Sequence, residues 1–308
     1  MERKVIVIVG PTCSGKSDIA FNIAKKFDTE IISADSRQIY KQLNIGTAKP
    51  SNEQLRLVKH HFINELDLEN VFDASKFEIK GLKIIEELFS KNKLPIVCGG
   101  TGLYIKALID GIISTVPNDI TLRQDLLNKR LIFGNEYIYN ELKKVDPKAA
   151  EKMLPQNWKR IIRALEVFHI TGNSILDIQK NLLRDKNIVF LQFGLRWNRE
   201  ILYNRINKRV NNMIEAGLVE EVKKILEMGY DKNLFSLNTV GYKEIIDYLE
   251  GKFSIDKAIE LIKRNTRRYA KKQFTWFNKD KRIFWLDIND KSEFDSITNK
   301  IIDISQTN

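Results

Sequence analysis

An apolar run that leads directly into a phosphate-loop motif is the feature that most constrains the fold. Residues Val5–Val9 are all apolar and β-branched, and Gly10–Ser17 follow at once with the pattern G-x-x-x-x-G-K-S. The amphipathic segment Asp18–Phe27 comes next, so the motif lies between a predicted strand and a predicted helix. This context aims backbone N–H groups and the positive end of a helix dipole at one anion. The sequence therefore predicts a site for a di- or triphosphate.

The predicted phosphate site consists of consecutive residues, which are Gly10, Pro11, Thr12, Cys13, Ser14, Gly15, Lys16 and Ser17. Lys16 adds a mobile cation, and the Ser17 hydroxyl is placed to join the coordination shell of a Mg²⁺ ion. The loop alone does not reveal which phosphate it holds.

Composition narrows the class of protein. Fifty-one Lys and Arg against 40 Asp and Glu give a net charge of +11, but an AT-rich coding bias would also raise the Lys content. No apolar run reaches the length of a membrane span, and the first strand starts too early for a signal peptide. The cysteines Cys13 and Cys98 fit neither a disulfide framework nor a zinc site, and His60 and His61 are expected at the surface. We therefore expect a cytoplasmic protein without membrane contact.

Strand, turn and helix follow one another repeatedly. Predicted strands over 30–33 and 94–98 end in turns that carry Asp35 and Thr101, and helices are predicted over 74–90 and from Leu103 to Asp110. This order predicts an α/β fold, a doubly wound parallel sheet resembling that of P-loop NTPases, with ligands at the carboxyl ends of its strands. We therefore expect the phosphate loop, Asp35 and Thr101 to converge.

From about Thr115 the alternation stops. Pro117 marks a break, helices are predicted over 122–133, 136–144 and 158–171, and sheet-like sequence returns at Ile188. We interpret residues 115–187 as a helical insertion, and residues 1–114 with 188–308 as the α/β core with C-terminal helices. The alternative is a helical layer on the core itself. The remaining predicted elements are helices over 199–215, 219–228, 242–249 and 255–277 and an edge strand over 282–286.

Asp35 and Thr101 each allow a functional and a structural interpretation. Asp35 would either bind Mg²⁺ or take a proton from an incoming nucleophile, whereas an Asx turn or N-cap is the structural alternative. Thr101 would either hydrogen-bond a substrate or cap the following helix. Proximity to the phosphate loop favours function for Asp35 and leaves both interpretations of Thr101 open.

Positive charge is concentrated on two predicted helices. Between Lys263 and Lys272 six cations occur without an acid, and a second basic cluster, Trp158–Arg163, lies in the insertion. Basic helices with aromatic residues are typical of nucleic-acid binding, and two of them indicate an extended polyanion. Arg205 and Arg209 share a face of another helix and would suit a phosphate clamp, although a solvated basic face is the simpler interpretation.

Seven ordered motifs make the chain resemble the tRNA dimethylallyltransferases, also called tRNA isopentenyltransferases. They are the segments 10–17, 34–40, 44–50, 99–105, 163–167, 240–244 and 266–277. A phosphate loop occurs in many families, whereas this ordered set is specific. The resemblance implies transfer of a dimethylallyl group from dimethylallyl pyrophosphate to the exocyclic N6 amine of the adenosine on the 3′ side of the anticodon. It also implies Mg²⁺ as cofactor, the anticodon stem-loop of tRNA as partner and a monomeric enzyme.

The same resemblance implies roles for single residues. The phosphate loop would hold the pyrophosphate, with Lys16 neutralising it and Ser17 placing Mg²⁺, and Arg209 would stabilise the departing pyrophosphate. Asp35 would accept the proton from the amine, and Thr101 would hydrogen-bond close to it. The implied tRNA contacts are Asp35, Ser36, Arg37, Gln38, Thr101, Arg123, Lys159, Arg160, Ile161, Ile162 and Arg163, with 238–243 and 271–277 as further candidates.

The chain departs from the family pattern in details. Cys13 stands where a smaller alanine or a threonine-like residue is commoner, and Gln156 and Asn157 stand where an aspartate is frequent. The zinc-finger extension of the eukaryotic members is not expected, which points to a bacterial-type enzyme. Two other functions stay open: a kinase that uses ATP at the loop, and a non-catalytic RNA-binding protein with a nucleotide-gated loop.

Overall fold

The chain forms two compact units. The computed structural model describes residues 3–112, 116, 119–180 and 187–307. Met1–Ile109 and Asp185–Asn308 make up the first, which we call the core unit, and Asp110–Arg184 make up the second, which we call the insertion unit. Thr115 and Pro117, where the sequence predicted the start of the insertion and a break, lie outside the described residues.

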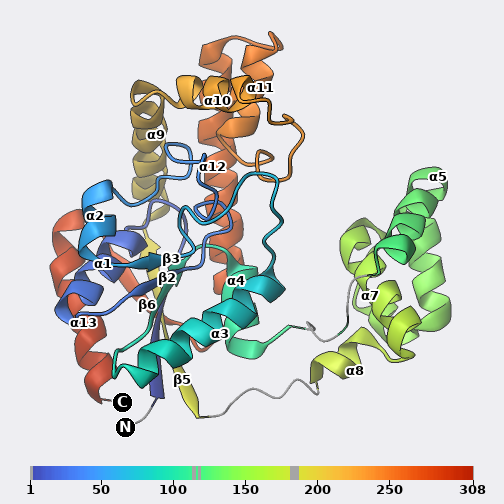
Figure 1. Ribbon diagram of the computed structural model, residues 1–308, viewed down its shortest axis with the longest axis horizontal. Coiled ribbons are helices and arrows are strands. Elements are labelled where there is room, and N and C mark those ends of the chain that lie inside the picture. Colours follow the sequence, from blue (N-terminus) through green and yellow to red (C-terminus); the bar gives the residue numbers. More distant parts are fainter. Residues whose placement is uncertain (1–2, 113–115, 117–118, 181–186, 308) are drawn as a thin grey trace. The chain divides into compact units, whose positions relative to one another are not determined.

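A parallel sheet organises the core unit. Among the described residues it has six strands in the spatial order β3-β2-β4-β1-β5-β6 (Figure 1). They are β1 (Arg3–Val9), β2 (Ile31–Ser33), β3 (His60–His61), β4 (Ile96–Gly99), β5 (Ile188–Trp197) and β6 (Phe284–Ile288). The predicted α/β class and the edge position of the last strand are confirmed. Because the chain turns to one side of β1 before the insertion and to the other side after it, the ligand crevice is expected at the end of β1.

The strand register brings the predicted site residues together. Val9 of β1 lies opposite Gly99 of β4, and Ser33 of β2 lies opposite Cys98. The three strands therefore end at the same edge of the sheet, where the phosphate loop and the turns with Asp35 and Thr101 begin. Val5–Val9 are fully buried because β1 has a neighbour on each side and helices on both faces.

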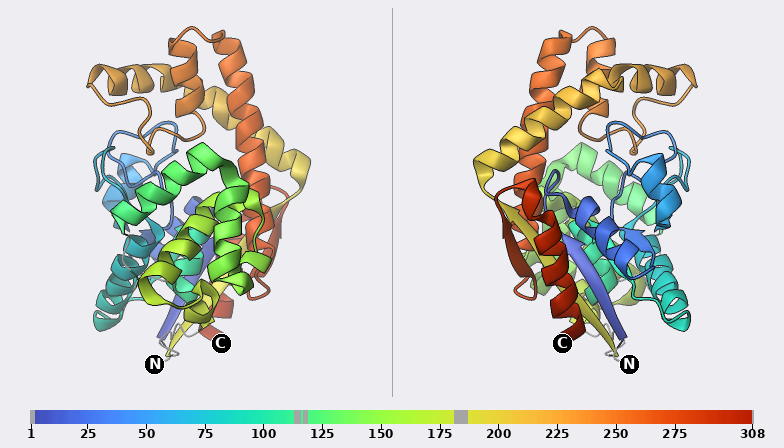
Figure 2. Two further views of the ribbon diagram at one scale, coloured as in Figure 1. Left: turned by 90° about the vertical axis from the view of Figure 1, so that its right-hand side faces the viewer. Right: turned by 90° about the vertical axis from the view of Figure 1, so that its left-hand side faces the viewer.

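Helices cover both faces of the sheet. α1 and α13 pack side by side on one face (Figure 2, right), and α3 and α4 lie on the other. Their bounds are α1 (Lys16–Lys26), α2 (Asn52–Leu57), α3 (Ala74–Ser90), α4 (Gly102–Asp110) and α13 (Phe294–Thr307). The sequence analysis missed α13, whose buried residues Ile297 and Ile301 pack in the same core cluster as α1.

Four further helices stand beyond the carboxyl ends of the strands (Figure 1). They are α9 (Arg199–Glu215), α10 (Leu218–Glu227), α11 (Tyr242–Leu249) and α12 (Ile255–Phe277). The bounds predicted for α9, α11 and α12 are confirmed, and α10 is shifted by one residue. α9 and α12 pack against each other, and each reaches the phosphate loop with a side chain, Arg205 of α9 and Gln273 of α12.

The expectation that His60 and His61 are surface residues is wrong. They form β3, which pairs with β2, and both are half-buried. His61 Nε2 lies 2.6 Å from Glu30 Oε2. The sequence analysis missed β3 and α2 because a strand of two residues and a helix of six give no resolvable periodicity.

The insertion unit is helical in its described part. It contains α5 (Ile120–Val145), α6 (Pro147–Glu151), the 3₁₀ turn η1 (Pro155–Asn157), α7 (Trp158–Thr171) and α8 (Ile175–Lys180). Gly134, with φ 84° and ψ 178°, interrupts α5 between the two segments that the sequence predicted as separate helices. Leu126, Ile138, Leu142 and Leu165 belong to a hydrophobic cluster within this unit. Among the described residues, no helix combines the length and apolar character that a membrane crossing requires.

Candidate active site

The phosphate loop has the open conformation that an anion requires. Gly15 takes φ 86° at the N-cap of α1 and supplies no capping side chain, so the N–H groups of the first helical turn stay available. A Cβ at Gly15 would also lie 2.1 Å from the ring of Phe294. Gly15 is therefore required both by the backbone and by the packing of α13.

Two side chains of the core unit fix the outer part of the loop. Trp197 Nε1 donates to Ser14 O at 2.9 Å, and Arg205 Nε donates to Cys13 O at 3.0 Å. The Arg205 guanidinium lies 4.1 Å from the ring centroid of Trp197. Arg205 thus supports the loop backbone and is not the solvated cation of the simpler interpretation.

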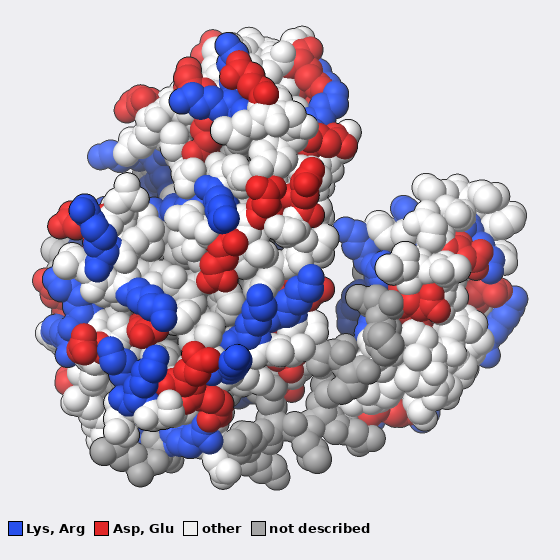
Figure 3. Space-filling view, in the orientation of Figure 1, with Lys and Arg blue, Asp and Glu red and all other residues white. Residues whose placement is uncertain are grey.

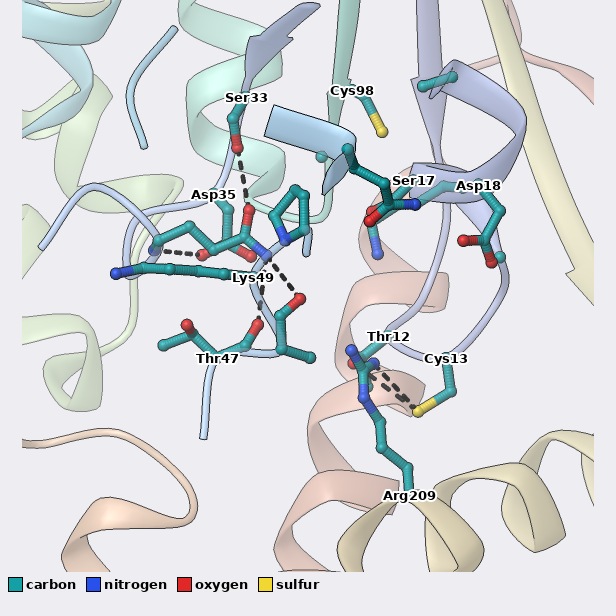
Figure 4. A pocket seen from close by; sticks show the side chains of 18 of the residues that line it. Thr12, Cys13, Ser17, Asp18, Ser33, Asp35, Thr47, Lys49, Cys98 and Arg209 are labelled. Carbon is teal, nitrogen blue, oxygen red and sulfur yellow. Dashed lines mark hydrogen bonds between the residues drawn. The ribbon is translucent and has the colours of Figure 1, made fainter. Parts of the chain in front are cut away.

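The loop forms one wall of a cavity of about 690 Å³, which we call the phosphate-side cavity. Figure 4 shows Asp35, Thr47 and Lys49 on one side of it and Thr12, Cys13, Ser17 and Asp18 on the other. Its lining is rich in cations, which are Lys16, Lys49, Arg205, Lys208, Arg209 and Lys291. A cavity with this lining suits a ligand with several negative charges.

Lys16 has a position consistent with a role in charge neutralisation. Its Nζ donates to Pro11 O at 3.3 Å, within the loop itself. Burial lowers the pKa of Lys16, and the neighbouring groups Cys98 and Asp35 act in the opposite direction. A bound anion would stabilise the charged form of this amine.

Arg209 reaches the loop from α9. Its Nη1 lies 3.3 Å from Thr12 Oγ1 and 3.4 Å from Cys13 Sγ (Figure 4). The two arginines therefore have different roles, since Arg205 holds the loop backbone and Arg209 points into the cavity.

Asp35 forms the Asx turn of the structural interpretation, and its functional interpretation stays a prediction. Its Oδ1 accepts hydrogen bonds from Arg37 N at 2.8 Å and Gln38 N at 3.3 Å, which is an Asx turn. Its second oxygen makes no hydrogen bond among the described residues, and Asp35 lines the phosphate-side cavity. The turn thus orients one oxygen and leaves the other for a ligand.

Thr101 holds this turn. Its Oγ1 accepts from Ser36 N at 3.1 Å, and its backbone N donates to Ala34 O at 3.1 Å. It lies at the start of α4 but its hydroxyl is directed to the neighbouring turn. The position of Thr101 therefore supports Asp35 from the adjacent strand end.

A second cavity of about 550 Å³, which we call the α12-side cavity, adjoins the first. It is lined by the Asp35 turn, by the segment 238–241 and by a face of α12. Four residues line both cavities, namely Thr12, Asp35, Thr47 and Arg209. The carboxylate and the guanidinium proposed for catalysis thus lie where two binding spaces meet.

The basic residues of α12 face two different neighbours. Arg268 and Lys272 line the α12-side cavity together with Tyr269. Arg267 instead donates to Asn207 Oδ1 on α9 at 2.6 Å. On the face of the core unit seen in Figure 3 the two signs of charge are mixed, so the net charge forms no uniform basic surface there.

The predicted tRNA contacts of the insertion unit differ in exposure. Lys159 and Arg160 are exposed, and Arg123 and Arg163 both pair with the buried carboxylate of Glu166. Ile161 and Ile162 are fully buried in the cluster of this unit. The prediction that Ile161 and Ile162 contact tRNA is wrong, because both side chains lie on the face of α7 that packs into the hydrophobic cluster.

Ser17 is the metal ligand that the sequence analysis predicted. Its exposed position in the first turn of α1 lines the phosphate-side cavity beside Asp18. Within the described ranges, no group of three His, Cys, Asp or Glu side chains is arranged to bind a metal. One hydroxyl with phosphate oxygens and water fits Mg²⁺, which keeps several waters in its shell.

Sequence reasoning missed part of the cavity walls. Lys49 Nζ donates to Tyr40 O at 2.6 Å and to Asn64 Oδ1 at 2.5 Å, and it fastens the 44–50 loop that forms a wall of both cavities. Glu221 of α10 accepts from the backbone N of Ile45 at 2.8 Å and closes the same loop from the other side. No local pattern around Glu221 indicates this role, whereas Lys49 lies within a motif already noted.

Comparisons with known proteins agree over nearly the whole chain. The family model described as IPP transferase matches residues 38–280. The tRNA dimethylallyltransferase of Acetivibrio thermocellus is 49% identical over 95% of this chain and 93% of its own length. That of Alkaliphilus oremlandii is 45% identical over 97% of this chain and 95% of its own length.

Solved structures give the same result. A tRNA isopentenylpyrophosphate transferase from Bacillus halodurans aligns with a TM-score of 0.72 and 35% identity, covering 99% of this chain and 97% of that one. A eukaryotic dimethylallyltransferase acting on tRNA aligns with a TM-score of 0.85 and 30% identity, covering 98% of this chain and 78% of that one.

Proposed function

The chain belongs to the IPP transferase family, and from this premise we propose how its two adjoining cavities carry out the reaction of a tRNA dimethylallyltransferase. The enzyme transfers a dimethylallyl group to tRNA. The acceptor that we propose is the exocyclic N6 amine of the adenosine on the 3′ side of the anticodon. The observation that carries the proposal is that Asp35 and Arg209 line both cavities.

The donor occupies the phosphate-side cavity. The pyrophosphate of dimethylallyl pyrophosphate takes the N–H groups of the first turn of α1, with Lys16 and Arg209 neutralising it. Charge grows on the bridging oxygen as the C1–O bond breaks, and preorganised cations lower the free energy of that transition state.

The acceptor base occupies the α12-side cavity. To reach it, the adenosine leaves the stack of the anticodon loop, and Tyr269 offers a ring against which a base can stack. The N6 lone pair attacks C1 of the allyl group, the C1–O bond breaks and pyrophosphate leaves. The proton from N6 goes to the oxygen of Asp35 that the Asx turn leaves unbonded.

Mg²⁺ is part of the proposal. Ser17 is the residue that would hold it, and the ion would supply positive charge to the pyrophosphate oxygens. Thr101 has a positioning role, since its hydroxyl fixes the turn that carries Asp35.

The RNA backbone is held by basic residues outside the reacting centre. Arg37, Arg268 and Lys272 line the α12-side cavity, and Lys159 and Arg160 are exposed on the insertion unit. The enzyme that we propose is a monomer. The thiols of Cys13 and Cys98 are free, which supports a reducing, cytoplasmic setting.

A donor competition assay tests this function. Purified protein is incubated with Mg²⁺, unmodified tRNA and labelled dimethylallyl pyrophosphate, and in a parallel reaction with ATP labelled in its γ-phosphate. We expect label in RNA only from the prenyl donor, and nucleoside digestion to place it on N6 of a single adenosine. Transfer of the γ-phosphate of ATP to any acceptor, without prenyl transfer, would replace the proposal by the kinase alternative.

A further inference from the structure

The amide of Gln273 connects two of the motifs that form the site. Gln273 lies on α12 and is 7% exposed. Its Oε1 accepts from Thr12 N at 2.8 Å, and its Nε2 donates to Gly100 O at 2.9 Å. One side chain thus joins the phosphate loop to the turn that follows β4.

Gly100 provides the space that this amide occupies. A Cβ at Gly100 would lie 2.2 Å from Gln273 Nε2, so the glycine is required for the amide to fit. Both ends of the amide are paired, as a buried amide requires, because an unpaired buried polar group destabilises the folded state.

The residue held by this amide is Thr12, which lines both cavities. Thr12 presents its N–H to Gln273, and its Oγ1 lies 3.3 Å from Arg209 Nη1. Arg268, Tyr269 and Lys272, which precede Gln273 on α12, line the α12-side cavity. The helix that offers cations to the RNA therefore also sets the loop that receives the pyrophosphate.

We infer that Gln273 is a positioning residue for the transfer: it fixes Thr12, and with it Arg209, at the junction of the two cavities. This inference rests on the proposed function. It also replaces the expectation that Gln273 contacts tRNA, since its amide is turned away from solvent and fully engaged within the protein.

Two variants separate hydrogen bonding from packing. Gln273→Met keeps the length and approximate volume of the side chain and removes both hydrogen bonds. Gln273→Glu keeps the acceptor for Thr12 N–H but places an anion against Gly100 O when it is ionised. When protonated, its carboxyl again donates to Gly100 O, and burial raises the pKa of such a group.

The measurements are kcat, KM for dimethylallyl pyrophosphate, and the Kd for an anticodon stem-loop RNA. For Gln273→Met we expect kcat to fall about 10-fold or more while the RNA Kd changes less than about 3-fold, because a small misplacement near the reacting atoms suffices. For Gln273→Glu we expect its activity relative to the unchanged protein to rise as the pH is lowered from about 8.5 to about 6, whereas that ratio stays constant for Gln273→Met. Glu260→Gln, an exposed position on the same helix, is the matched control and should leave all values unchanged.

The outcomes separate this inference from the proposed function. The Kd of inorganic pyrophosphate, measured by calorimetry, needs no prenyl transfer, and we expect it to be weaker in Gln273→Met. The inference is wrong if Gln273→Met has the wild-type Tm and if its pyrophosphate Kd and its kcat both lie within twofold of the wild-type values. If the activity of Gln273→Glu depends on pH in the same way as that of Gln273→Met, Gln273 has only a packing role and the inference is also wrong. Pyrophosphate binding without any prenyl transfer by the unchanged protein would instead reject the proposed function.

Discussion

At the scale of the residue, the site depends on side chains that have one polar atom engaged and another turned to a cavity. Asp35 gives one oxygen to the N–H groups of Arg37 and Gln38, and Arg209 contacts Thr12 while lining both cavities. The first contact fixes the orientation of each side chain and lowers the entropic cost of its second contact with a ligand.

Asp35→Asn tests the proposed base with little change in shape. The asparagine oxygen still accepts from Arg37 N and Gln38 N, so the turn is kept, but the side chain no longer takes a proton. We expect kcat to fall by about 10²–10⁴ while the RNA Kd stays within about 3-fold. Steady-state kinetics and filter binding measure the two values. A kcat within a factor of ten of the unchanged protein would mean that another group takes the proton.

The two cysteines should differ in reactivity. Cys13 is half-buried and lines the phosphate-side cavity, whereas burial raises the pKa of Cys98 to about 12. Because the thiolate is the reactive form, Cys98 remains a protonated, unreactive thiol at about pH 8. We expect iodoacetamide to label Cys13 alone, and pyrophosphate to slow that labelling, as read by peptide mass spectrometry. The Cys13→Ala variant is the control, and labelling of Cys98 in it would contradict the expectation.

At the scale of the element, α12 lines the α12-side cavity and holds the phosphate loop, a wall of the other cavity, through Gln273. Its cavity-facing positions Arg268 and Lys272 are four residues apart and therefore share a face. Arg267 lies on another face, against α9, where its guanidinium holds Asn207. Charge on this helix thus has both a binding and a packing role, and the periodicity of α12 separates them.

The double variant Arg268→Glu with Lys272→Glu tests the RNA-binding face. We expect a weaker RNA Kd and a slope of log Kd against log salt that is flatter by about 1 to 2 units, because fewer counterions are released on binding. Pyrophosphate affinity should remain. Lys83→Glu with Lys91→Glu, two exposed lysines that line neither cavity, is the matched control. Equal losses in both double variants would mean that only the net charge matters.

At the scale of the whole molecule, the two units have separate hydrophobic clusters. The core unit buries residues of β1, α1 and α13 together, and the insertion unit buries residues of α5, α6 and α7. Glu166 pairs with Arg123 and Arg163 inside the insertion unit, so the orientation of these arginines depends on that cluster. A substitution that weakens the packing of one cluster should therefore first impair the function of the unit that contains it.

Ile161→Ala tests this separation. It removes a fully buried side chain of the insertion unit, and we expect a loss of about 2–5 kcal/mol in the stability of that unit. Hydrogen exchange should accelerate in α5 and α7 but not in β1, and RNA affinity should fall while pyrophosphate affinity is kept. Ile19→Ala, at a fully buried position of α1, should give the reverse pattern. Uniform acceleration over both units in either variant would contradict two independent cores.

The sequence by itself determined the features that have a local cause. The run Val5–Val9 with its glycine-rich continuation predicted the central strand and the phosphate loop, and helical periodicity predicted α3, α7, α9, α11 and α12 with their observed bounds. The order of motifs also predicted the family. These features depend on neighbouring residues, whose spacing is visible in the sequence.

Only the tertiary structure decided which side chains meet. Two contacts join residues that are distant in the chain: Arg205 reaches the phosphate loop, and Gln273 bridges Thr12 and Gly100. The burial of Ile161 and Ile162 depends on which face of α7 is covered. Periodicity gives the faces of a helix but not the neighbour of each face, because that neighbour is fixed by packing across the sheet and between helices. The site residues follow from the strand ends, and their division of roles follows from the packing around them.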